Sequence, residues 1–557
     1  MRAKIPAALR AKLAKTHGGS EVDRKLRADP YGVLRAAGAS LEAADKVAAS
    51  LGLPGHRRAE GHAVYLLGDG VLSSAMLASK LRFSLGVPEA TARSLMAGWQ
   101  RRGVLVEGEG AVVTAAYHET LLKVAREVLR RGREAPARPA FAVPEGLSPD
   151  QAAAATVIAT RRMCVITGGP GTGKSALVRA VLDACPDARV TAPTGRAARN
   201  AFGKTIHHFK TIQEATGKDL GEARVVIVDE ASMVSTKLLE AVLDLAPRDA
   251  HVVLVGDVDQ LPPIDEGDAL RDVIASGAVP VHTLRHNFRS DAGVQALAAA
   301  VLAGRLPATL PAVADVVACE SLAEVINAAA ACSDDMILTP HNLTRVQINA
   351  AVQLRRWAEA GGMGVLDAAD RVCVATMRDD DVFVGERRVG SVAEAVEALR
   401  AYPGAGVVSY EKCVLRRGDR VIVTRNGETA CNGDVGVLAS VEAEHVDVDV
   451  TLAQGAPVRV ALESTGGEVD DLTLAYCVTV HKAQGSEFPA VVLPVWSPRM
   501  WSRTMLYTAV TRAQHRVVFL GSRSALDEIV GSEDRPRAPS ALFRYLRAAV
   551  ATCKTAE

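Results

Sequence analysis

The segment Met163–Leu182 constrains the fold of this chain more than any other part of the sequence. Its first four residues are apolar and predict a buried strand, and its last eight have a helical pattern. Between them stands the loop Gly168-Gly169-Pro170-Gly171-Thr172-Gly173-Lys174-Ser175. Glycines in such a loop let backbone N–H groups converge on phosphate oxygens, and the following helix N-terminus adds partial positive charge. Because a strand precedes the loop and a helix follows it, we predict a nucleoside triphosphate site rather than an ordinary glycine-rich turn.

Several residues of this segment have expected roles in binding ATP and Mg²⁺. Lys174 is expected to reach the outer phosphates, and the hydroxyl of Ser175 is expected to ligate Mg²⁺. Gln151 follows a helix start with a serine cap and a proline at the first position, and it can pair with the edge of adenine. The alternative for Gln151 is an unremarkable exposed side chain. The predicted nucleotide-binding residues here are Gln151, Gly168, Gly169, Pro170, Gly171, Thr172, Gly173, Lys174, Ser175 and Ala176.

Strand and helix patterns alternate after the loop, which predicts an α/β fold with a mostly parallel sheet. Three more apolar runs end in polar residues, at 191–196, 225–230 and 252–257. Open α/β sheets bind ligands at the carboxyl ends of their strands. The second run delivers Asp229, which is expected to hold Mg²⁺ through water, and Glu230, which is expected to polarise the attacking water. A strand that ends in acids by chance is the alternative, and the phosphate loop in the same sheet speaks against it.

The rest of the chain divides into regions with different sequence patterns. A second α/β set has strands expected at 336–340, 491–495 and 516–520, and between them short alternating runs with tight turns predict a small antiparallel barrel. The N-terminal part is predicted to consist of helices with a small wing. A helical hairpin is expected there around Gly38 and Ser40, and it either holds DNA phosphates or is purely structural. The predicted boundaries are 1–134 for the N-terminal helical region, 135–147 for a linker, 148–285 for a first lobe with a short hairpin at 210–222, 286–409 and 465–557 for a second lobe, and 410–464 for the barrel.

Composition limits the classes of function. With 557 residues the chain can form several domains, and its net charge of +1 gives no global nucleic-acid signature. The basic runs Arg126–Arg138 and Arg2–Lys15 are candidate nucleic-acid surfaces, although a solvated face explains each one more simply. Nine cysteines occur singly with no C-x-x-C pair, which fits a reducing cytoplasm. We expect a cytoplasmic protein without a signal peptide or a membrane span, because Val294–Ala303, its most apolar helix, is too short.

Taken together, the motifs resemble those of superfamily-one DNA helicases, and within them the RecD-like group, over nearly the whole chain. The segments that carry the resemblance are Val228–Met233, Gly256–Pro263, Leu284–Arg289, Tyr476–Phe488 and Tyr507–Ala513, with support from Thr205–His207 and Gly418–Gly436. The resemblance implies two RecA-like parallel-sheet lobes, the N-terminal helical region, and an SH3-like insertion in the second lobe that contacts single-stranded DNA.

The resemblance also implies roles for individual residues. Gln260 would link the γ-phosphate to the DNA site, and Arg289 and Arg512 would act as arginine fingers from the second lobe. Gly485 and Glu487 would join the nucleotide site. The implied catalytic set is Lys174, Asp229, Glu230, Gln260, Arg289 and Arg512, and the implied DNA-binding set is Pro193, Thr194, Arg196, His207, Thr479, His481 and Lys482. For any one threonine, helix capping or strand packing is the alternative.

The implied activity is that of an ATP-dependent 5′→3′ DNA helicase acting on single-stranded and tailed duplex DNA. Two other interpretations stay open: a single-strand translocase that does not unwind duplex, and an ATP-gated DNA-binding factor that does not step. The extra N-terminal domain of longer relatives is expected to be absent, and Asn349–Arg417 is longer than expected. His208–Ala223, where the group has a strand-separating hairpin, is short, so we expect robust translocation but weak duplex opening.

Overall fold

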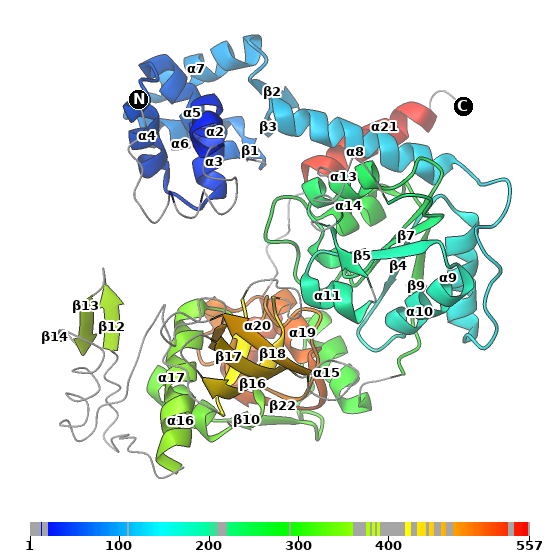
Figure 1. The fold of residues 1–557 in the computed structure, drawn as a ribbon, viewed down its shortest axis with the longest axis vertical. Coiled ribbons are helices and arrows are strands. Elements are labelled where there is room, and N and C mark those ends of the chain that lie inside the picture. Colours follow the sequence, from blue (N-terminus) through cyan, green and yellow to red (C-terminus); the bar gives the residue numbers. More distant parts are fainter. Residues whose placement is uncertain are drawn as a thin grey trace.

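The computed structural model of the chain describes residues 10, 13, 21–68, 70–108, 111–201, 203–206, 209, 220–288, 291–332, 334–359, 375–378, 381–384, 387–389, 418–424, 432–441, 445–450, 458–463, 472–532 and 540–554. It contains two parallel sheets, an antiparallel insertion and an N-terminal module of helices (Figure 1). The predicted α/β fold with two parallel-sheet lobes is therefore confirmed.

The N-terminal module consists of short helices followed by a small antiparallel sheet. The Ser40 hydroxyl accepts a hydrogen bond from Ala43 N at 3.2 Å and so caps α4, the second helix of the expected helical hairpin. The three strands lie in the order β1-β3-β2. The elements are α2 (Val22–Ala28), α3 (Pro30–Ala36), α4 (Leu41–Ser50), α5 (Gly55–Leu67), β1 (Leu72–Ser73), α6 (Ser74–Leu85), α7 (Glu89–Arg101), β2 (Leu105–Gly108) and β3 (Ala111–Thr114).

The first lobe is built on a six-stranded sheet in the order β6-β5-β7-β8-β4-β9, in which all paired strands are parallel. Strands β4, β7 and β8 are buried at every residue, as expected for a parallel sheet with both faces covered. The elements are α9 (Pro149–Thr160), β4 (Met163–Gly168), α10 (Lys174–Ala184), β5 (Ala188–Ala192), α11 (Gly195–Asn200), β6 (Lys204–Thr205), β7 (Val225–Val228), η1 (Ala231–Met233), α13 (Thr236–Leu245), β8 (His251–Gly256), α14 (Ala269–Ser276) and β9 (Val281–Leu284).

The second lobe has a five-stranded parallel sheet in the order β10-β22-β21-β11-β20. Its elements are α15 (Ala292–Leu302), β10 (Ala314–Val317), α16 (Leu322–Ala331), β11 (Met336–Thr339), α17 (Asn342–Glu359), β20 (Cys477–Thr479), β21 (Phe488–Pro494), η2 (Pro498–Met500), α19 (Arg503–Val510), β22 (Ala513–Leu520) and α20 (Arg523–Gly531). No helix among the described residues, α15 included, is both long and apolar enough to cross a bilayer.

The insertion is an antiparallel sheet in the order β18-β17-β16-β15-β19. Its strands are β15 (Arg420–Val423), β16 (Val435–Val441), β17 (His445–Val450), β18 (Val458–Glu463) and β19 (Leu472–Leu474), so the last strand lies beyond the predicted boundary at residue 464. Among the described strands, β18 and β19 form the two edges, and closure into an SH3-like barrel stays a prediction. A separate three-stranded sheet, β12 (Ala375–Arg378), β13 (Asp381–Val384) and β14 (Arg387–Val389), lies in the long segment before the insertion. Of the predicted hairpin at 210–222, residues 210–219 lie outside the described part.

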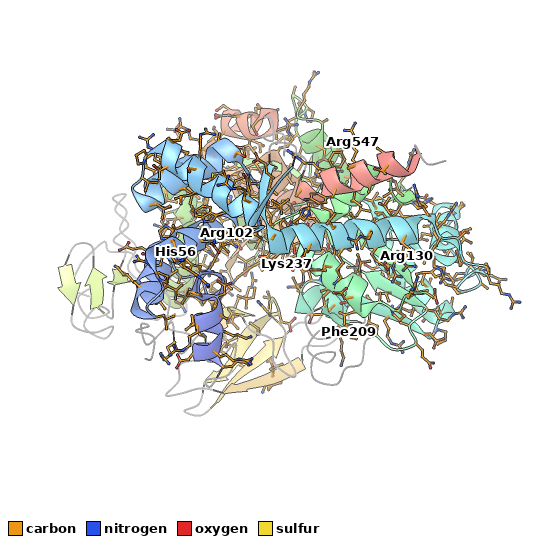
Figure 2. The ribbon with its side chains drawn as sticks, turned by 90° about the horizontal axis from the view of Figure 1, so that it is seen from above. His56, Arg102, Arg130, Phe209, Lys237 and Arg547 are labelled. Carbon is orange, nitrogen blue, oxygen red and sulfur yellow. The ribbon has the colours of Figure 1, made fainter. Side chains whose placement is uncertain are left out.

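Two long helices from opposite ends of the chain cover the first lobe. Helix α8 (Ala115–Arg133) packs on α13, and α21 (Ala541–Lys554) packs on α8 and α14, so their apolar faces share one core with the first sheet. Figure 2 shows α21 running beside α8. The assignment of the whole segment 465–557 to the second lobe is therefore wrong for α21. An amphipathic helix needs an apolar surface to cover, and here the first lobe supplies it.

Part of the predicted basic run at 126–138 belongs to this packing. Arg131, with 1% of its surface exposed, donates hydrogen bonds to the carbonyls of Ala246, Pro247 and Ala250. Arg130, labelled in Figure 2, forms ion pairs with Glu127 and Glu134 on the same helix. Arg130 and Arg131, two of the five arginines of this run, are therefore neutralised or buried at the junction of α8 and α13, whereas Arg126, Arg133 and Arg138 are exposed.

Candidate nucleotide and DNA site

The glycine-rich loop joins the end of β4 to the start of α10. Gly171 and Gly173 have φ angles of 75° and 82°, a left-handed conformation that side chains rarely adopt. A Cβ on Gly168 would lie 2.8 Å from the carbonyl oxygen of Leu284, and one on Gly173 would lie 2.5 Å from Nε2 of Gln151. Only glycine fits these positions without displacing a neighbour. The loop is thus a backbone cradle at a helix N-terminus, which suits a phosphate chain.

The polar side chains around the cradle are held in place by the loop itself. Lys174 Nζ donates to the carbonyl oxygens of Gly168 at 2.7 Å and Gly169 at 2.9 Å. Gln151 Nε2 donates to the carbonyl oxygen of Gly173 at 3.3 Å, while its Oε1 accepts from Ser148 N and completes a capping box for α9. Gln151 therefore ties α9 to the loop, and its contact with adenine stays a prediction. Ser175 and Ala176 lie exposed in the first turn of α10.

Two acids follow β7 and lie close to the loop. Asp229 is buried, and burial followed by the charge of Glu230 raises its pKa to about 7. The charge of Lys174 acts in the opposite direction, which places its ammonium group within electrostatic range. Oxygen ligands of this kind, the Asp229 carboxylate with the Ser175 hydroxyl, are those that Mg²⁺ prefers. A bound cation would favour the ionised form of Asp229.

Glu230 is held in a strained backbone conformation. Its φ of 51° is the only positive value at a non-glycine among the described residues, and its N–H donates to Oδ1 of Asp229 at 2.9 Å. Such a conformation costs about 1–3 kcal/mol and persists where the surrounding structure fixes it, often at functional sites. The second lobe comes near this residue, because a Cβ on Gly485 would lie 3.9 Å from Oε1 of Glu230 and 3.8 Å from Cβ of Ala197.

The segment after β9 lies against the loop. Asn287 Nδ2 donates to the carbonyl oxygen of Pro170 at 2.6 Å, and Phe288 N donates to that of Gly171 at 2.8 Å. The ring of Phe288 is 55% exposed and would lie 3.4 Å from a Cβ on Gly173, so it forms an open aromatic wall beside the cradle. Sequence reasoning missed Phe288, although an aromatic directly before the expected finger was a usable signal. Arg289 itself lies outside the described residues.

The two lobes meet beside the cradle through buried hydrogen bonds. Leu261 N donates to Oγ1 of Thr508 at 2.9 Å, and Gln484 Nε2 donates to the carbonyl oxygen of Leu261 at 3.3 Å. Gln260 is buried next to this contact, and its Nε2 donates to Oδ2 of Asp257 at 3.2 Å. The predicted residue Gln260 therefore lies at the interface of the two lobes.

Arg512 is buried within the second lobe, close to this interface. Its guanidinium donates to the carbonyl oxygens of Thr508 at 3.1 Å and Ser486 at 3.2 Å, and to Oγ1 of Thr511 at 3.3 Å. Ser486 follows Gly485, which approaches Glu230, so these contacts connect Arg512 to the segment nearest the acids. The neighbouring Glu487 accepts from Nε2 of Gln514 at 3.3 Å.

The residues predicted to bind DNA fall into two groups. After β5, next to Pro193, the Thr194 hydroxyl accepts from Ala197 N and caps α11, and Arg196 Nη1 donates to the carbonyl oxygen of Gly433 in the insertion at 2.9 Å. This contact brings the first lobe and the insertion together across 237 residues of sequence. His207, the remaining predicted residue of the first lobe, lies outside the described part.

The second group begins at Thr479, the last residue of β20, which is the edge strand beside β11. Thr479 Oγ1 accepts from Lys482 N at 3.4 Å. The Lys482 side chain reaches solvent, although partial burial and then the charge of Arg345 lower its pKa. Burial lowers the pKa of His481, so at pH 7 its imidazole is neutral and offers hydrogen bonds rather than charge. Of these residues, Lys482 is thus the one that offers an exposed positive charge for a phosphate.

Comparisons with known proteins agree with this geometry. Residues 146–321 match the family model described as an AAA domain, and residues 474–520 match the UvrD-like helicase C-terminal domain. The ATP-dependent RecD2 DNA helicase of Deinococcus radiodurans is 32% identical over 436 residues, which are 73% of this chain and 54% of that protein. The RecBCD enzyme subunit RecD of Mycolicibacterium smegmatis is 27% identical over 450 residues, 70% of this chain and 74% of that protein.

Among solved structures, the crystal structure of Pif1 helicase from Candida albicans is 17% identical and aligns with a TM-score of 0.44. The alignment covers 74% of this chain and 99% of that one. The match to the RecD2 helicase spans about half the length of that relative.

Proposed function

We propose that this chain, which belongs to the RecD-like helicases of superfamily one, is an ATP-driven DNA motor that moves 5′→3′ along a single strand and opens duplex ahead of it. One observation carries the proposal. The second lobe approaches Glu230 through Gly485, and Arg512, buried in the second lobe, donates to the carbonyl oxygen of the adjacent Ser486. A nucleotide bound there would contact both lobes and could change their separation.

The described residues suggest how hydrolysis proceeds. Lys174 and the loop amides bind the phosphates, and Mg²⁺ held by Ser175 and Asp229 would neutralise phosphate charge. Glu230 polarises the attacking water. Negative charge develops on the transferred phosphoryl group, and Arg512, with Arg289 as the second predicted finger, stabilises it once the lobes close. Fingers of this kind contribute roughly 10³–10⁵ in rate.

Hydrolysis must also move the lobes along DNA. Our candidate strand contacts are Arg196 of the first lobe, which contacts the insertion, and Lys482 of the second lobe, which follows β20. If each lobe grips the strand, closing on ATP and opening after hydrolysis shifts one grip relative to the other. DNA should therefore accelerate ATP hydrolysis, because it favours the closed arrangement.

Binding of single-stranded DNA should weaken steeply as salt rises. Each phosphate neutralised by a lysine or arginine contributes about −0.7 to the log–log slope for single strands. Titration of a fluorescent oligonucleotide at several salt concentrations measures this slope, and Lys482→Ala should reduce it by about one phosphate. A slope near zero would contradict an electrostatic strand groove, and an unchanged slope in the variant would remove Lys482 from it.

Unwinding should require a single-stranded 5′ tail. This expectation rests on membership in the RecD-like group, and strand displacement from duplexes with a 5′ tail, a 3′ tail or no tail tests it. We expect release of the labelled strand only from the 5′-tailed substrate. Efficient opening of 3′-tailed duplex would reverse the proposed direction, and stepping without any strand release would favour the single-strand translocase.

A further inference from the structure

Tyr507 lies on α19 of the second lobe, with its side chain buried against the first lobe. It is 3% exposed, and its hydroxyl donates to Oδ2 of Asp257 at 3.0 Å. A Cβ on Gly169 would lie 3.7 Å from the same hydroxyl oxygen, so the group also borders the phosphate cradle. One hydroxyl thus stands where the cradle, the end of β8 and the second lobe meet.

Asp257 connects this hydroxyl to Gln260. Nε2 of Gln260 donates to the same oxygen, Oδ2, at 3.2 Å, and the other oxygen accepts from Asp259 N at 3.1 Å. The carboxylate therefore holds two side chains that come from different lobes. Burial, and then the negative charge of Asp257, raises the pKa of Tyr507, so its hydroxyl stays protonated and remains a donor at physiological pH.

The orientation of Gln260 follows from this arrangement. Its amide nitrogen faces Asp257, because a carboxylate accepts hydrogen bonds and would repel the carbonyl oxygen. The carbonyl oxygen Oε1 is buried and has no hydrogen-bond partner within the described part of the chain. A buried acceptor without a hydrogen-bond partner lowers the stability of the fold. We therefore expect a donor to reach this oxygen during function. A water molecule that attacks the terminal phosphate is a donor of this kind.

We propose that Tyr507 is a positioning residue, whose hydroxyl fixes the Asp257 carboxylate so that the Gln260 amide oxygen is aimed at a donor in the nucleotide site. The inference rests on the proposed function and deepens it. Because the hydroxyl comes from the second lobe, the aim of Gln260 depends on how the lobes are placed. Movement of the lobes would then alter the rate of hydrolysis through one shared carboxylate.

Tyr507→Phe tests the role of the hydroxyl, because it keeps the ring and removes only the donor. Loss of one hydrogen bond to a charged group lowers a rate by about tenfold to hundredfold when the bond supports the transition state. We expect kcat for ATP hydrolysis to fall by that factor, with the Kd for ATP little changed. The matched control is Tyr31→Phe, since Tyr31 is also buried and donates to a carboxylate, Asp45, but in the N-terminal module. It should lose stability and keep the wild-type kcat.

A double-mutant comparison shows whether Tyr507 acts through Gln260. If it does, the variant carrying both Tyr507→Phe and Gln260→Ala should hydrolyse ATP no more slowly than Gln260→Ala alone. Asp257→Asn is a second test of the same connection, because it weakens the shared acceptor while residue 507 remains a tyrosine. Its kcat should match that of Tyr507→Phe.

Three results would overturn the inference: a Tyr507→Phe variant as fast as Tyr31→Phe, a Kd for ATP that rises as much as kcat falls, or losses that multiply in the double variant. Failure of the proposed function gives a different pattern. In that case DNA would not accelerate ATP hydrolysis by the wild type. The role of Tyr507 could still be tested, because the variants would be compared by their rates of hydrolysis without DNA.

Discussion

Replacement of Lys174 by alanine should abolish ATP hydrolysis while leaving single-strand binding largely intact. The ammonium group already lies within the loop, at 2.7 Å and 2.9 Å from two of its carbonyl oxygens, where the outer phosphates are expected. Loss of one charge-stabilising donor costs about 10²–10³ in rate. Strand binding should persist, because its candidate contacts lie on α11, the insertion and the segment after β20.

Steady-state hydrolysis and oligonucleotide binding, measured on the same preparation, check this expectation. Lys237→Ala is a suitable control, since Lys237 is an exposed lysine on α13 of the same lobe (Figure 2). Wild-type turnover in Lys174→Ala would contradict the assignment of the phosphate loop. Equal loss of turnover in both variants would point to a general effect of removing a lysine from this lobe.

Replacement of Arg512 by alanine should lower kcat by about 10³–10⁵ and change nucleotide affinity far less, because a finger acts mainly on the transition state. The guanidinium is buried between α19 and the segment that approaches Glu230, where it can reach developing charge only when the lobes are together. Rapid-quench kinetics together with nucleotide titration separates the two effects.

The same replacement removes the donor to the buried carbonyl group of Ser486, whereas that of Thr508 still accepts from Oγ1 of Thr511 at 2.9 Å. A buried acceptor that loses its donor costs about 1–3 kcal/mol in stability. Arg131→Ala controls for this cost, because Arg131 is also buried and donates to three carbonyl oxygens, but at the junction of α8 and α13. We expect both variants to unfold at lower temperature and only Arg512→Ala to lose kcat. Equal losses of affinity and rate in Arg512→Ala would make it a ground-state or structural contact.

Local patterns were sufficient to predict the phosphate loop and four of the six strands of the first sheet, β4, β5, β7 and β8, but not β6 and β9. Strands β4, β7 and β8 are continuous apolar runs, and the glycines that follow β4 occupy conformations that other residues avoid. The packing of α21 could not be predicted in the same way. Its residues Leu542 and Leu546 define an apolar face, but sequence periodicity does not say which lobe that face will cover.

Without the family resemblance, the site was predictable only where its residues are close in sequence. Lys174 and Ser175 follow from the loop pattern, and Asp229 from the end of a strand. The contact of Tyr507 with Asp257 joins residues 250 positions apart, and no local pattern pairs a tyrosine on one lobe with an acid on the other. Gln151 shows the opposite case, since Ser148 and Gln151 at this spacing match a capping box, and that structural role was overlooked in favour of adenine.

The central claim is that ATP hydrolysis drives movement toward the 3′ end of a DNA strand. Displacement of streptavidin from oligonucleotides biotinylated at either end measures this movement without requiring duplex opening. We predict ATP-dependent release from the 3′ end, little release from the 5′ end, and none in Lys174→Ala. Hydrolysis that DNA does not stimulate, or stimulated hydrolysis without release from either end, would contradict the claim.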